Sequence, residues 1–104
     1  MKNLREVAKV IRSKNSSPMM LTLDIIFKDR GTYEEVKARD LINKDVIAGA
    51  YQVEPSFIEK VIYFDPAIAV KIGMPRPVRS GSPGDTDVYG AQQHGPLLGI
   101  NLDL

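Results

Sequence analysis

The side chains that could do chemistry gather in one segment of the 104-residue chain, from Met74 to Pro96. It holds the only histidine, His94, together with Asp85 and Asp87. Imidazole titrates near neutral pH, so a histidine beside a carboxylate is suited to acid–base catalysis. The two aspartates are two positions apart and would point the same way in extended backbone. These three residues are the predicted catalytic groups, although a lone histidine is more often a surface or core residue.

The same segment carries groups that could bind an anion. Arg76 and Arg79 lie in the run Pro75-Arg76-Pro77-Val78-Arg79, where two prolines fix the local backbone. A stiff segment loses less entropy when its arginines bind a carboxylate. The alternative is a polyproline-like connector. Three neutral polar side chains complete the predicted substrate-binding set of this segment: Tyr89, Gln92 and Gln93.

A second polar cluster lies near the start of the chain. Arg12, Ser13, Lys14 and Asn15 are consecutive, and the cluster is followed by the carboxylate of Asp24. Arginine offers a forked contact to a carboxylate or phosphate, and lysine offers a point charge. The four residues are therefore predicted to bind substrate, while the alternative is a solvated loop with two surface cations.

Several kinds of chemistry have no support in the sequence. The chain has no cysteine and one histidine, which excludes a disulfide framework, a cysteine nucleophile and an ordinary structural zinc site. It contains no glycine-rich nucleotide fingerprint and no nucleophile elbow. Asp24, Asp85 and Asp87 match no Mg²⁺ or Ca²⁺ loop spacing. We therefore predict no cofactor and no metal.

The composition is that of one soluble globular domain over residues 1–104, with 43% hydrophobic and 26% charged residues. A net charge of +1 predicts no field for nucleic acid or an anionic membrane. We see neither a signal peptide nor an apolar run of membrane-spanning length. The expected location is the cytoplasm.

Alternating apolar and polar residues predict strands over Leu21–Lys28, Phe57–Phe64 and Ala67–Gly73, and a last strand from Leu98 to the end. Such strands favour an antiparallel sheet. The segment Arg12–Pro18 is predicted to be a polar loop, because Asn, Ser and Pro favour turns.

Helix signals are fewer. Thr32 and Glu35 form a capping-box pattern that predicts a helix over 33–39. Asn43 is the predicted cap of a second helix over 44–51. Residues 4–11 fit a helix or a strand equally well. The predicted fold is α+β: a small antiparallel sheet with two short helices on one face and a long Gly/Pro-rich loop, 74–96, before the last strand.

Three long blocks resemble a family of small bacterial and archaeal proteins catalogued as a domain of unknown function. They begin A-K-V-I-R-S-K-N at Ala8, F-D-P-A-I-A-V-K at Phe64 and G-S-P-G-D-T-D-V at Gly81. The order of elements is also similar to the small ferredoxin-like domain that accompanies acyclic terpene utilisation protein A. That domain has an R-S-G-D-K-G loop where this chain has Arg12-Ser13-Lys14-Asn15 and lacks the glycine–aspartate pair.

The resemblance implies a ferredoxin-like fold and a larger partner related to acyclic terpene utilisation protein A, in catabolism of carboxylic acids or acyl-CoA thioesters. On this basis the leading hypothesis is a small subunit that completes the active site of a hydratase or lyase acting on a di- or tricarboxylic acid. The chain would not be active alone, and a homo- or hetero-oligomer is expected. The alternative is a non-catalytic interaction or regulatory module that docks through residues 74–96.

Overall fold

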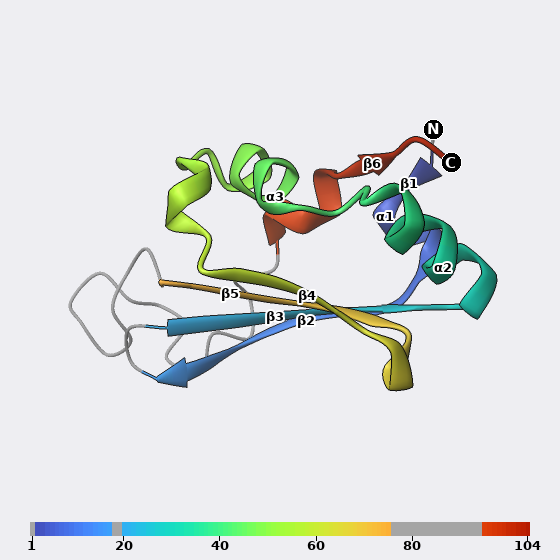
Figure 1. The fold of residues 1–104 in the computed structure, drawn as a ribbon. Helices are drawn as coiled ribbons and strands as arrows, with labels where there is room; N and C mark the ends of the chain where they lie inside the picture. Colours follow the sequence, from blue (N-terminus) through green and yellow to red (C-terminus); the bar gives the residue numbers. More distant parts are fainter. Residues whose placement is uncertain (1, 18–19, 76–94) are drawn as a thin grey trace.

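The computed structural model of the chain describes residues 2–17, 20–75 and 95–104 (Figure 1). Its α-helices are α1 (Leu4–Val7), α2 (Arg30–Arg39) and α3 (Lys44–Tyr51). Its strands are β1 (Lys2–Asn3), β2 (Ala8–Ser17), β3 (Met20–Phe27), β4 (Lys60–Phe64), β5 (Ala69–Pro75) and β6 (Asn101–Leu102). Three 3₁₀ turns complete the list: η1 (Pro55–Phe57), η2 (Asp65–Ala67) and η3 (Gly95–Gly99).

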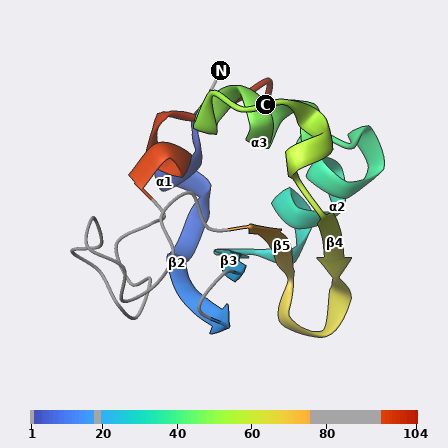
Figure 2. The same cartoon turned by 90° about the vertical axis from the view of Figure 1, so that its left-hand side faces the viewer.

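The main layer is a four-stranded antiparallel sheet in the order β2-β3-β5-β4. Figure 2 shows the four strands in this order, with the helices above them. The helices and η3 lie on one side of the sheet in Figure 1, and the described residues leave the other side uncovered. This arrangement confirms the predicted α+β class, with an antiparallel sheet and helices on one face, as in ferredoxin-like domains.

The core lies between the sheet and the helices. β3 supplies every second side chain to it, namely Leu21, Leu23, Ile25 and Phe27, all fully buried. Strict alternation is what a strand with one covered face requires. The rings of Phe27 and Tyr33 are 6.0 Å apart, so an aromatic contact joins the central strand to α2.

Helix ends follow local capping rules, with one departure from the predicted caps. Asn43 caps α3 by accepting a bond from the Val46 amide at 3.0 Å, as predicted. α2 begins earlier than predicted, because Asp29 is its cap and accepts from the Thr32 amide at 2.8 Å. The prediction of Thr32 as the cap was wrong. An aspartate three positions before that amide is also a preferred N-cap.

A small second sheet pairs the two ends of the described chain. β1 and β6 are antiparallel, with Lys2 opposite Leu102 and Asn3 opposite Asn101. Just inside it, the Leu4 amide donates to the Ile100 carbonyl at 2.8 Å. Figure 1 shows this pair on the helix side of the molecule, with both ends close together.

Several predicted boundaries need correction, among them the strand predicted over Ala67–Gly73, which is β5 at Ala69–Pro75 and takes the first two residues of the predicted 74–96 loop. Residues 4–11 are both helix and strand, because α1 ends at Val7 and β2 starts at Ala8, which adds a third, one-turn helix to the two predicted. The predicted loop 12–18 is the second half of β2 as far as Ser17. β4 starts at Lys60 because Pro55 opens a 3₁₀ turn before it. The last predicted strand, from Leu98 to the end, shrinks to the two residues of β6, because Leu98 and Gly99 belong to η3.

Candidate functional site

The candidate site lies on the open face of the sheet, which is the side that the helices leave uncovered. This face carries several charged side chains that could bind a ligand. Each strand places alternate side chains there, so cross-strand neighbours form rows. Strand pairing defines three rows of four, which we number by their place along the sheet. Row 1 is Val10, Ile26, Ala69 and Phe64; row 2 is Arg12, Asp24, Lys71 and Ile62; row 3 is Lys14, Thr22, Gly73 and Lys60.

Row 2 holds the one carboxylate that the described residues place on the open face. Asp24 accepts from Arg12 Nε at 3.1 Å and from Lys71 Nζ at 3.3 Å, and its side chain is only 14% exposed. Its position on β3 explains this, because the strands on either side supply one cation each. Lys71 also lies over the Phe64 ring, 5.4 Å from its centroid. Arg12 and Lys71 are thus engaged with groups of the protein itself.

Row 3 has a different character, because its cations lie at the two ends. Among the described residues, no carboxylate lies within ion-pair distance of Lys14 or Lys60. Between them lie the hydroxyl of Thr22 and the bare backbone of Gly73. A Cβ on Gly73 would be 3.1 Å from Cε and 3.2 Å from Cγ of Lys60. The stem of Lys60 therefore lies flat across β5 in the space that glycine leaves.

Row 1 and its neighbour Ile62 form the apolar part of this face. Ile62 is 44% exposed and Phe64 is 41% exposed, and they are the large hydrophobic residues that the described surface exposes. Both lie on the edge strand β4. Adjacent exposed apolar side chains mark interaction surfaces more often than isolated ones do.

The open face is also strongly asymmetric in charge. Its four cations and one carboxylate give it a net charge of +3, although the whole chain carries only +1. This asymmetry is not visible in the net charge of the whole chain. Composition reports the sum of the charges, whereas strand pairing decides which of them share a face.

The structure separates the predicted cluster of residues 12–15. Because these residues form a strand rather than a loop, Arg12 and Lys14 point to the open face. Ser13 and Asn15 point to the covered face, where Ser13 is only 7% exposed and Asn15 is half-buried. One ligand cannot touch all four side chains from one side of the sheet. Arg12 and Lys14 remain candidates for an anion on the open face.

The other predicted site residues lie outside the described residues, and their roles remain predictions. They are Arg76, Arg79, Asp85, Asp87, Tyr89, Gln92, Gln93 and His94. Several residues on the open face were missed, among them Lys60, Lys71 and Gly73. The sequence shows their alternation within β4 and β5, but it does not show that β5 lies between β3 and β4.

A second polar cluster lies on the turn between β4 and β5. Asp65 accepts from Tyr33 Oη at 2.6 Å and from Lys37 Nζ at 2.8 Å. The hydrogen bond from Lys37, followed by the one from Tyr33, lowers the pKa of Asp65. Burial, followed by the bond to Asp65, raises the pKa of Tyr33. The cluster joins α2 to the η2 turn, and that structural role accounts for its contacts.

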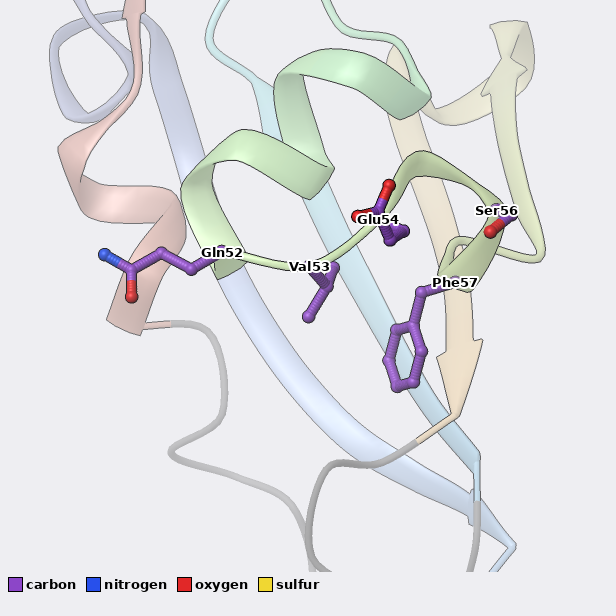
Figure 3. A pocket seen from close by; sticks show the side chains of 5 residues that line it. All are labelled: Gln52, Val53, Glu54, Ser56 and Phe57. Carbon is purple, nitrogen blue, oxygen red and sulfur yellow. The ribbon is translucent and has the colours of Figure 1, made fainter.

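An open hollow of about 690 Å³ lies beside the link between α3 and η1 (Figure 3). It is lined by Gln52, Val53, Glu54, Ser56 and Phe57. The lining contains a carboxylate and no cation, which does not suit a carboxylate ligand. In the described ranges, no group of three or more His, Asp or Glu side chains is placed to hold a metal ion.

Comparison with known proteins identifies the family. A family model described as "Domain of unknown function (DUF4387)" matches residues 4–101. The chain belongs to this family. The match spans the four-stranded sheet, the helices and the start of β6. No curated protein and no solved structure matches the chain. Within the described part of the chain, no helix is both long and apolar enough to cross a membrane.

Proposed function

We propose that this chain is a small subunit that completes the active site of a larger enzyme of carboxylic-acid or acyl-CoA catabolism. One observation carries the proposal: an uncovered sheet face combines a net charge of +3 with exposed Ile62 and Phe64. The resemblance to the small domain that accompanies acyclic terpene utilisation protein A supports a larger partner related to that protein.

The composition of the open face favours a partner of different sequence. Two copies packed through this face would place one charge of +3 against another, and like charges at close range are unfavourable. A partner with an apolar patch bordered by carboxylates would cover Ile62 and Phe64 and place those carboxylates near the cations of row 2. Apolar contact at the centre and charged contact around it is the usual organisation of a protein interface.

The chemistry proposed for the complex is addition or elimination of water on a di- or tricarboxylic acid. Such a step needs cations that hold the carboxylates and one group that carries a proton. Lys14 and Lys60 are cations without an internal carboxylate partner among the described residues, and His94 is the predicted proton carrier. A flat sheet face cannot enclose a small substrate, so the partner would supply the remaining walls.

Co-expression with a larger protein related to acyclic terpene utilisation protein A tests the assembly. Ile62→Asp is expected to weaken the complex at least about tenfold, because it places an anion in the apolar contact. Ala38→Asp makes the same kind of change on the exposed side of α2 and should leave the complex intact. Size-exclusion chromatography with light scattering measures both. Thermal unfolding of each variant alone checks that it folds.

Hydration of tricarboxylic acids by the complex tests the active-site role. His94→Ala should abolish activity while the complex still assembles. Full activity in this variant would refute a catalytic role for His94, and full activity after Lys14→Gln as well would favour a docking module without catalytic groups. Assembly of the Ile62→Asp variant at native strength would refute the open face as the interface.

A further inference from the structure

We infer that row 3 of the open face is itself a binding site for a ligand with carboxylates at two ends. This inference rests on the proposed function and deepens it, because it places the binding of such a ligand on one row of the same face. The site consists of Lys14 on β2, Thr22 on β3, Gly73 on β5 and Lys60 on β4. These residues come from four strands and share one line across the sheet.

The spacing of the strands defines the size of the ligand. Neighbouring strands are about 4.8 Å apart, so the backbones of Lys14 and Lys60 are separated by about 14 Å. Lys60 leans inward over Gly73, which carries its ammonium group from the edge strand toward the middle of the sheet. The two cations can therefore approach opposite ends of one small molecule that lies over Thr22, beside the Lys60 stem that covers Gly73.

Gly73 makes this arrangement possible. It is buried although it points to the open face, because the stem of Lys60 covers it. Any side chain here would displace that stem, since the contacts at 3.1 and 3.2 Å are closer than ordinary packing. The glycine thus determines where the Lys60 charge is held, without carrying a charge itself.

The charges of the neighbouring row explain why the ligand would bind here. In row 2, Arg12 and Lys71 already share the carboxylate of Asp24. In row 3, Lys14 and Lys60 have no such carboxylate among the residues described. The hydroxyl of Thr22 can donate one further hydrogen bond to an anion between them. An external anion would complete this row as Asp24 completes the other.

The type and placement of the cations favour a polycarboxylate over a phosphate. Lysine is a compact point charge, whereas a single phosphate is best held by arginine forks or several donors converging on one point. Here two point charges lie at opposite ends of a row. A molecule with two separated carboxylates would meet both, and a monocarboxylate would meet one.

Titration of the ¹⁵N-labelled chain with citrate, at constant ionic strength, tests the site by NMR. We expect saturable shifts of the amides of Thr22 and Gly73, with weaker binding of acetate and inorganic phosphate. Lys14→Gln and Lys60→Gln should each reduce citrate affinity about fivefold, because each removes one charge-assisted contact. Lys44→Gln removes an exposed lysine from α3 and is the matched control for charge.

Gly73→Ala is the decisive variant, because it keeps every charge. Its methyl group pushes the flexible stem of Lys60 aside, so citrate affinity should fall at least about threefold while the chain still folds. Unchanged affinity in this variant, or an equal loss in Lys44→Gln, would show that citrate responds only to overall charge and would overturn the site. Failure of citrate to bind would overturn it too, while the Ile62→Asp assembly test would still decide the proposed subunit role separately.

Discussion

At the scale of single residues, Asp65 joins three side chains of α2 to the turn after β4. Its carboxylate takes bonds from Lys37 and Tyr33, and its carbonyl accepts from Arg30 Nη2 at 3.5 Å. The Tyr33 ring is fully buried, so its hydroxyl depends on Asp65 for a partner. The turn between β4 and β5 is thereby attached to α2.

Asp65→Asn is expected to lower stability at pH 7 and to remove part of its pH dependence. The pKa of Asp65 is lowered in the folded state, so its stabilising effect is present above its unfolded pKa of about 4. The effect is lost as the pH falls through the lower folded value. Urea midpoints from pH 7 to pH 2 should show the native chain and the variant converging at low pH.

Glu59→Gln is the control for that comparison, since Glu59 is exposed and its side chain forms no hydrogen bond or ion pair with the described residues. It should follow the native curve. A constant difference between Asp65→Asn and the native chain down to pH 2 would show that lost packing, and not the ionised carboxylate, causes the change.

At the scale of elements, β2 shows why one stretch was misassigned. Residues 12–17 read R-S-K-N-S-S, a composition typical of loops. They form a strand because their backbone pairs with β3 from Ala8 opposite Phe27 to Ser17 opposite Met20. β3 and α3 were predictable because each carries its own period or cap within a few residues. A strand specified by its neighbour leaves no such local signal.

The end of α3 offers a prediction about the backbone. Gln52 adopts φ 56° and ψ 46°, a left-handed conformation that costs most residues about 1 kcal/mol and glycine almost nothing. Gln52→Gly should therefore raise the free energy of unfolding by about 0.5 kcal/mol, after the greater unfolded-state entropy of glycine is counted. Chemical denaturation measures this. Gln52→Ala retains the strain, so an equal gain there would exclude the backbone explanation.

At the scale of the whole molecule, the strand order determines what the sequence could reveal about the site. Lys14 was predicted from a local cluster, but Lys60 is 46 positions away along the chain and meets the same row only because β5 lies between β3 and β4. The class of fold follows from alternation that is visible in each strand. The composition of the open face follows from the order of strands, which no single segment specifies.

The β1–β6 pair is expected to stabilise the whole domain. Leu102 is 2% exposed and packs into the core beside Leu4. Leu102→Ala should cost about 2–5 kcal/mol, as for other buried leucines, and should speed hydrogen exchange of the Leu4 amide. Leu104→Ala removes a half-buried leucine next to it and should cost less. If Leu102→Ala and Leu104→Ala lower the free energy of unfolding equally, the stabilising contact lies outside the β1–β6 pair.

The meeting of both ends on the helix side has a practical consequence (Figure 1). A fluorescent label, an affinity tag or a fused protein attached at either end would project from the helix side of the molecule, opposite the open face. The ends are also close enough for a short linker, so the chain is a good candidate for circular permutation.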